Sequence, residues 1–149
     1  MQLTRFTDYC LRVLMYLCHK QELVTIAELA QAYQVSENHL MKVVNHLARK
    51  EYISTFRGKG GGMRLARAAS EINIASVIED CELTQGAVEC MREGNDSNCP
   101  LLPGCELRKV LYGAQRAFLD HLRKYSLQDL AANSGVQRVL IQESLSVNE

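Results

Sequence analysis

The sequence has no tryptophan, only two prolines and no net charge. This composition excludes collagen-like and low-complexity chains, and six cysteines in 149 residues are too few for a disulfide-dense miniprotein. No segment approaches the roughly 20 consecutive apolar residues of a membrane-spanning helix, so we expect no membrane partner. The first residues also lack an apolar signal core, which predicts a cytoplasmic protein.

The absence of net charge conceals two regions of opposite charge. Residues 1–67 contain ten Lys and Arg but only five Asp and Glu, a net charge of +5. Residues 68–149 contain seven basic and twelve acidic residues, a net charge of −5. A basic half of this kind favours an anionic partner for the first part of the chain.

Apolar residues at helical spacing predict three helices, over residues 5–19, 25–33 and 36–52. Thr25, followed three residues later by Glu28, has the pattern of a capping box, and Ser36 is a candidate N-cap for the third helix. Two short helices joined by a tight turn are typical of a helix-turn-helix. An ordinary three-helix bundle would have the same spacing.

A predicted β-hairpin follows directly, with strands over 52–56 and 63–66 and a tip of sequence RGKGGG. A helix-turn-helix followed by a glycine-rich basic hairpin predicts a winged helix that binds DNA. A plain surface hairpin is the alternative. A nucleotide phosphate loop fits less well, because no helix begins after the glycines.

The second half of the chain has a different organisation. Residues 74–81 form a short apolar helix, and residues 106–125 form a long amphipathic one whose apolar stripe predicts packing against a second copy of the chain. The expected fold is therefore mainly α with a small β-hairpin. Its expected units are a winged helix-turn-helix over 1–80, a cysteine loop over 81–105, and a dimerisation helix with a tail over 106–149.

Three cysteines stand in the predicted loop at the spacing C-x8-C-x5-C: Cys90, Cys99 and Cys105. Soft thiolates select zinc or iron–sulfur clusters. The C-x2–4-C spacing of a structural zinc site is absent, which favours a labile cluster over a structural zinc module. A redox disulfide is a further alternative. A thiol oxidoreductase is disfavoured because no C-x-x-C motif is present, so we expect no enzyme.

The other three cysteines, Cys10, Cys18 and Cys81, lie in apolar helix patterns, and we expect them to be small core residues. The acidic residues of 79–82 and 89–96 are expected to form a solvated face.

Almost the whole chain resembles a known family. The start MQLTRFTDYCLRVLMYL, the segment VSENHLMKVVNHLARKEYI, the hairpin RGKGGGMRLAR and the cysteine triad are similar to those of the winged-helix iron–sulfur regulators, which include NsrR, IscR and RirA. The NsrR-like members are the most similar. The resemblance implies a bacterial homodimeric repressor that binds palindromic promoter DNA and loses affinity when nitric oxide attacks its cluster.

The resemblance also implies a ligand set. Cys90, Cys99 and Cys105 would hold the cluster, with [4Fe–4S] favoured over [2Fe–2S], and Asp8 of the partner subunit would be the fourth ligand. IscR-like members have a histidine where this chain has Leu107, and RirA-like members tend to have asparagine at the position of Asp8. An iron- or redox-responsive regulator of the same family is the alternative function.

For DNA contacts we expect polar residues on the third helix and cations at the hairpin tip. The candidates are Ser36, Asn38, His39, Lys42 and Asn45 on the helix, and Arg57 and Lys59 at the tip.

Overall fold

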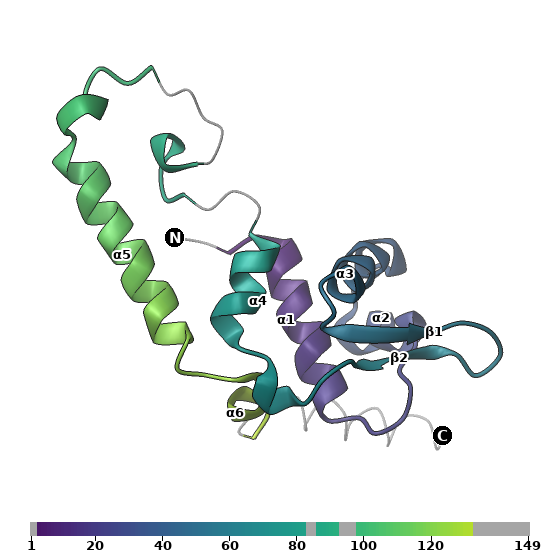
Figure 1. Ribbon diagram of the computed structural model, residues 1–149. Helices are drawn as coiled ribbons and strands as arrows, with labels where there is room; N and C mark the ends of the chain where they lie inside the picture. Colours follow the sequence, from purple (N-terminus) through teal and green to yellow (C-terminus); the bar gives the residue numbers. More distant parts are fainter. Residues whose placement is uncertain (1–2, 83–85, 93–97, 133–149) are drawn as a thin grey trace.

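A computed structural model describes residues 3–82, 86–92 and 98–132 (Figure 1). Helices and one antiparallel hairpin make up this part of the chain, which confirms the mainly α class. The elements in chain order are α1 (Arg5–Cys18), α2 (Ile26–Tyr33), α3 (Glu37–Arg49), β1 (Ile53–Phe56), β2 (Gly62–Leu65), η1 (Ala69–Glu71), α4 (Ile74–Cys81), η2 (Glu89–Met91), η3 (Leu102–Gly104), α5 (Glu106–Leu122) and α6 (Leu127–Ala131). The expected tail over 133–149 lies outside the described residues.

The first three helices pack around a shared apolar core. Leu14 of α1, Leu29 of α2 and Leu47 of α3 are completely buried, as the helical spacing of the apolar residues predicts. α2 and α3 are joined by a tight turn in which Gln34 adopts a left-handed conformation with φ of 50°. The helix-turn-helix is therefore confirmed.

The helix starts differ in detail from the sequence-based expectations. The hydroxyl of Thr25 caps α2 by accepting the Glu28 N–H at 3.1 Å. However, the Glu28 carboxylate does not return to Thr25. It accepts the Tyr16 hydroxyl and pairs with Lys20, each at 2.8 Å. Ser36 occupies the N-cap position of α3, but its hydroxyl makes no capping hydrogen bond.

The hairpin is anchored to the helices at its base. Ile53 pairs with Leu65 and Phe56 with Gly62, and the main chain of Met63 exchanges two hydrogen bonds with Val24. A Cβ at Gly62 would lie 2.8 Å from the Val24 carbonyl oxygen, so this close approach requires glycine. The tip extends away from the helices as a wing (Figure 1).

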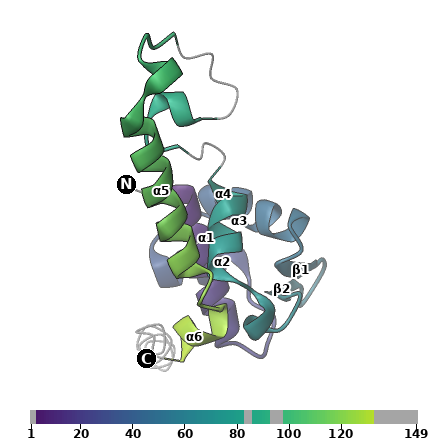
Figure 2. The same cartoon turned by 60° about the vertical axis from the view of Figure 1, so that its left-hand side comes forward.

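The N-terminal part of α5 extends beyond the other α-helices, whereas its C-terminal part lies beside α4 (Figures 1 and 2). Near its C-terminal end Leu119 is buried, and Phe118 and Leu122 pack against the core. Near its N-terminal end Leu107 and Val110 are exposed. We call the described residues 86–92 and 98–123, which include η2, η3 and α5, the arm. Within the described residues, no helix combines the length and apolar character needed to cross a membrane.

Candidate DNA interface and cysteine site

The surface of α3 separates polar from apolar residues. Leu40, Val43 and Leu47 are buried against the core. All five polar residues that the sequence predicts to contact DNA lie on the exposed side of this helix: Ser36, Asn38, His39, Lys42 and Asn45. A helix with one buried apolar face and one exposed polar face can enter the major groove without losing its packing.

Two features of α3 could not be read from the helical spacing. The Ser36 hydroxyl and Nδ1 of His39 lie 3.0 Å apart in a hydrogen bond, which holds the imidazole against the start of the helix. Met41 is 46% exposed in the middle of the polar face. An exposed methionine there can contact a thymine methyl group.

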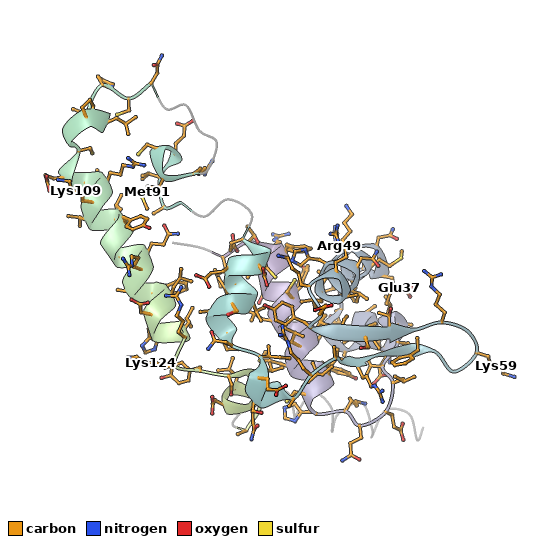
Figure 3. All side chains as sticks on the ribbon, viewed as in Figure 1. Glu37, Arg49, Lys59, Met91, Lys109 and Lys124 are labelled. Atoms are coloured by element: carbon orange, nitrogen blue, oxygen red, sulfur yellow. The ribbon has the colours of Figure 1, made fainter. Side chains whose placement is uncertain are left out.

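The wing presents cations to solvent. Arg57 and Lys59 are both exposed, and Figure 3 shows Lys59 at the tip of the hairpin. The structure adds a pair that sequence reasoning missed, in which the Arg64 guanidinium lies 5.1 Å from the ring centroid of the exposed Phe56. These residues are diagonal neighbours across the hairpin, and the strand register is the signal that could have identified them.

The three cysteines of the predicted cluster all lie at the free end of the arm. Cys90 belongs to η2, Cys99 is exposed, and Cys105 occupies the N-cap position of α5 without a capping side chain. All three are free thiols. In residues 3–82, 86–92 and 98–132, no three His, Cys, Asp or Glu side chains are close enough together to hold a metal ion. The structure therefore places the cysteines in one region without assembling them into a site.

These thiols nevertheless fit an anionic iron–sulfur cluster chemically. Thiolates are the usual ligands of such clusters. Cys105 lies at the positive end of the α5 dipole, where a negative charge is stabilised.

Asp8 lies on α1, with its side chain 47% exposed. Its carboxylate accepts two bonds from Arg12 one turn later, with Nε–Oδ1 at 3.1 Å and Nη2–Oδ2 at 2.9 Å. The Tyr33 hydroxyl at the end of α2 in turn donates to the Arg12 carbonyl at 3.0 Å. Asp8 is thus at the surface, and both of its carboxylate oxygens are bonded to Arg12.

The acidic residues at the end of α4 are not a solvated face, contrary to expectation. Glu79 pairs with Arg123, the C-cap residue of α5, at 2.6 Å. Glu82 accepts the Thr4 N–H at 2.8 Å and also the Thr7 hydroxyl, which connects α4 to the start of α1. These long-range partners have no signature in the local sequence pattern.

Asp80 has two partners on the other side of α4. Its Oδ1 accepts Lys50 Nζ at 2.6 Å, and its Oδ2 accepts the Tyr52 hydroxyl at 2.7 Å. Burial, the largest single influence, would raise the pKa of Asp80, but the two hydrogen bonds together with the nearby charges of Lys50 and His46 outweigh it and hold the pKa below its ordinary value. Burial, followed by the bond to Asp80, raises the pKa of Tyr52.

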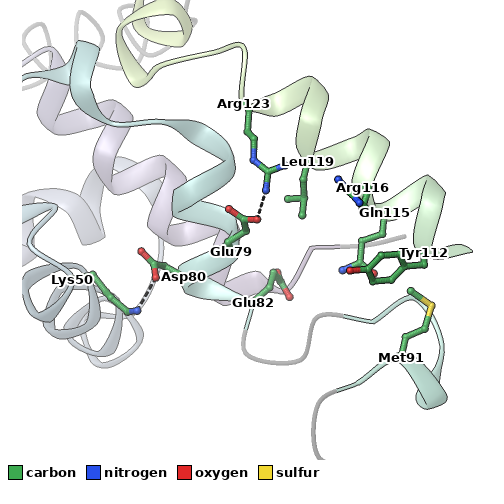
Figure 4. Close-up of a pocket in the computed structure, with 10 residues that line it drawn as sticks. All are labelled: Lys50, Glu79, Asp80, Glu82, Met91, Tyr112, Gln115, Arg116, Leu119 and Arg123. Carbon is green, nitrogen blue, oxygen red and sulfur yellow. Dashed lines mark hydrogen bonds and ion pairs between the residues drawn. The ribbon is translucent and has the colours of Figure 1, made fainter.

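A cavity of about 640 Å³ lies between α4 and α5 (Figure 4). Figure 4 shows Glu79 directed towards α5 and Asp80 directed towards Lys50. Leu119 and Tyr112 of α5 also line the cavity. The end of α4 therefore lies between the arm and α3, the second helix of the helix-turn-helix, which we call the recognition helix.

The core cysteines largely match the prediction. Cys10 and Cys81 are buried, whereas Cys18 is half-buried against the core. A hydrogen bond with Cys81, together with burial, raises the pKa of the Cys10 thiol. A thiol that stays protonated and buried is a poor metal ligand.

Comparison with known proteins agrees with this description. The family model described as "Rrf2: Iron-dependent Transcriptional regulator" matches residues 3–133. The HTH-type transcriptional regulator NsrR of Bacillus licheniformis is 45% identical over 143 residues, which cover 95% of this chain and 99% of the relative. The NsrR of Bacillus subtilis is 43% identical over 135 residues, covering 89% and 92%.

Solved structures share the fold at lower identity. CymR, the global cysteine regulator of B. subtilis, superposes with a TM-score of 0.69 at 20% identity, covering 90% of this chain and 98% of CymR. IscR of T. potens superposes with a TM-score of 0.67 at 18% identity, covering 87% and 85%. The chain is thus a transcriptional regulator rather than an enzyme, and it belongs to the Rrf2 family.

Proposed function

We propose that this regulator is a cytoplasmic, homodimeric repressor that binds palindromic promoter DNA and releases it in response to nitric oxide. A [4Fe–4S] cluster would be held by Cys90, Cys99 and Cys105, with Asp8 of the partner subunit as the fourth ligand. The observation that carries the proposal is the position of the three free thiols at the end of the arm. The arm contacts the winged-helix region, by which we mean α1 to α4 with the hairpin, through α4.

The polar face of α3 and the cationic wing support DNA binding. Asn38 and Lys42 are exposed and would read base edges, and Arg57 and Lys59 are exposed and would contact phosphates. A palindromic site follows from a two-fold dimer, because each copy presents one recognition helix to one half-site.

The exposed apolar surface of α5 supports the homodimer. Leu107, Val110 and Tyr112 are 64%, 66% and 58% exposed, respectively. Apolar surface on one side of a long helix needs a covering partner, and most soluble oligomers are symmetric copies of one chain. The dimerisation unit is expected over 106–149, and the structure describes it as far as residue 132. Within this part, α5 fits the proposed arrangement.

Several features of the chain suit the proposed ligand set. Cys90 and Cys99 lie outside regular helices, so their positions can adjust around a bound group. The Asp8 carboxylate is a hard ligand for a soft cluster and therefore a weak one. Arg12 can take back this carboxylate when it is released, because the two side chains are already paired. The bound cluster would supply the iron sites with which nitric oxide reacts.

The response requires only a modest coupling between the cysteine loop and the DNA-binding face. A difference of about 1–3 kcal/mol between two conformations changes DNA affinity roughly 5- to 150-fold. The chain between the two sites is short, because η1 and α4 are the elements that lie between the wing and η2, which contains Cys90 (Figure 1).

Anaerobic purification tests the proposal. We expect brown protein with iron and sulfide, which shifts a palindromic promoter fragment and loses this shift on addition of nitric oxide. Cys99→Ala should lose iron and sulfide and keep its fold, whereas Cys18→Ala, a thiol outside the loop, should retain both.

Other outcomes would overturn the proposal. Colourless protein that binds the same DNA and ignores nitric oxide contradicts it. Zinc without sulfide would identify a structural metal module. Release of DNA by an iron chelator or an oxidant, but not by nitric oxide, would identify the iron- or redox-responsive alternative.

A further inference from the structure

We infer that Asp80 is the positioning residue that transmits the state of the cysteine loop to the recognition helix and the wing. The inference rests on the proposed function, since it assigns a role in the regulation of that site. It starts from the end of α4, residues 79–82, where neighbouring side chains bond to different parts of the molecule.

Asp80 connects α4 to the two elements that would meet DNA. Lys50 is the C-cap residue of α3, and Tyr52 immediately precedes β1. Each of the two carboxylate oxygens accepts one bond, at 2.6 Å from Lys50 and at 2.7 Å from Tyr52. One side chain therefore fixes the end of the recognition helix relative to the start of the wing.

The buried ring of His46 lies on the same end of α3, one turn before Lys50. The backbone of Asp80 acts on this ring and opposes the lowering of the His46 pKa by burial. The ring is also 5.2 Å from that of Phe6 of α1. The end of α3 and the end of α4 are therefore close neighbours, and the two bonds of the Asp80 carboxylate are the contacts that join them.

The other side of the end of α4 contacts the arm and α1. Glu79 bonds to Arg123, the C-cap residue of α5, and Glu82 bonds to Thr4 and Thr7 at the start of α1. The chain then continues into the segment that contains Cys90. A rearrangement of the cysteine loop or of α5 therefore acts first on the end of α4. The side-chain bonds of Asp80 carry it on to the end of α3 and the start of the wing.

Glu79 provides a matched control for Asp80. The two carboxylates are adjacent, their side chains are 34% and 32% exposed, and each forms an ion pair of 2.6 Å. They differ in direction, because Glu79 bonds to the arm and Asp80 to the recognition helix (Figure 4). Replacing either by its amide removes one charge from the same turn, so a difference between the variants reports direction rather than charge.

The test uses the full chain, purified anaerobically, as wild type, Asp80→Asn and Glu79→Gln. For each protein we measure iron and sulfide per chain, the thermal midpoint, and the promoter Kd with and without the cluster. In the wild type the ratio of the two Kd values gives the coupling. We expect Asp80→Asn to retain its cluster and to reduce this ratio by about fivefold or more, while Glu79→Gln changes it by less than about twofold.

A merely structural role gives a different result. Asp80 would then stabilise the fold equally in both states, and Asp80→Asn would lower the thermal midpoint while the Kd ratio stayed at the wild-type value. That outcome overturns the inference. A wild-type ratio of one instead overturns the proposed function, so the two failures are distinguishable.

Two further variants keep the inference testable if Asp80→Asn does not fold. Lys50→Met and Tyr52→Phe each remove one of the two bonds from the opposite side. Both should reduce the Kd ratio while iron and sulfide stay constant. Lys50→Arg, which keeps the positive charge, should retain most of the wild-type Kd ratio. Wild-type ratios in both Lys50→Met and Tyr52→Phe would contradict the inference.

Discussion

The winged-helix region and the arm differ in what covers their apolar side chains. Leu14 and Leu29 of the winged-helix region are completely buried by neighbouring helices. Leu107 and Val110 of the arm are more than half exposed. The first region therefore buries its apolar side chains within one copy of the chain, whereas the arm presents the apolar surface that a second copy would cover in the proposed dimer.

The cysteines follow the same division. In the winged-helix region Cys10 is buried beside Cys81, and this neighbour and burial raise its pKa. In the arm Cys99 is exposed and Cys105 begins a helix. The sequence pattern already separates the two sets of cysteines, and the structure adds the reason: a buried thiol that stays protonated is a poor ligand, whereas Cys99 is open to solvent.

The largest expected effect tests whether stability resides in the winged-helix region. Leu14→Ala should lower the free energy of unfolding by about 2–5 kcal/mol, because it leaves a cavity in a packed core. Leu101→Ala, at an arm residue that is 68% exposed, should change it by about 0.5 kcal/mol or less. Urea denaturation followed by circular dichroism measures both. Equal losses of unfolding free energy in the two variants would contradict the conclusion that stability resides in the winged-helix region.

The next effect tests the arm as the surface between two copies. Val110→Glu places a charge in the exposed apolar stripe and should weaken self-association by about tenfold or more. Lys109→Glu, at an adjacent residue that is 70% exposed and ion-paired with Glu106, is the control and should retain the wild-type dimer. Sedimentation velocity over a range of concentrations measures the change. A monomeric wild type would refute the assignment.

A smaller effect tests which region meets DNA. Lys59→Ala should reduce the slope of log K against log salt by about 0.9, the amount expected for one lost phosphate contact. Lys124→Ala removes the same charge on the opposite side of the molecule and should leave the slope unchanged (Figure 3). Titration of labelled promoter DNA at several salt concentrations gives both slopes. Equal slopes for wild type and Lys59→Ala would remove the wing tip from the interface.

The two regions were also unequally predictable from the sequence. Helical spacing identified the buried face of α3 and, by exclusion, the exposed polar residues from Ser36 to Asn45. This works because burial on a helix repeats with the helical period. The loop around Cys90 and Cys99 has no such period, so spacing indicates the ligands but not how they come together.

The end of α4 shows a second limit. Its acidic residues have the appearance of a solvated face, because partners such as Lys50 and Arg123 are distant in the sequence. The predicted capping role of Ser36 was wrong for a related reason. Ser36 has the right identity and position for a cap, yet the nearby His39 ring takes its hydroxyl. Competition between partners is decided by tertiary geometry, which local patterns do not contain.

The smallest expected effect concerns His46, on the buried face of α3 within the winged-helix region. Burial lowers its pKa, and the nearby charges of Arg49 and Lys50 act in the same direction, against the opposing influence of Asp80. The folded state therefore keeps the ring neutral at a pH where the unfolded chain already binds a proton. The resulting stability is complete above about pH 6.5, the ordinary histidine pKa, and is lost as the pH falls through the lower pKa of the folded state.

His46→Leu should reduce this part of the pH dependence, because leucine fills the buried position without titrating. We expect the difference in urea midpoint between pH 7.5 and pH 5.5 to be smaller in His46→Leu than in the wild type. Val44→Ala, on the same buried face of α3, should lower the midpoint equally at both pH values. An unchanged pH dependence in His46→Leu would show that the buried ring does not limit stability in mild acid. The pH dependence would then arise from carboxylates or from other histidines.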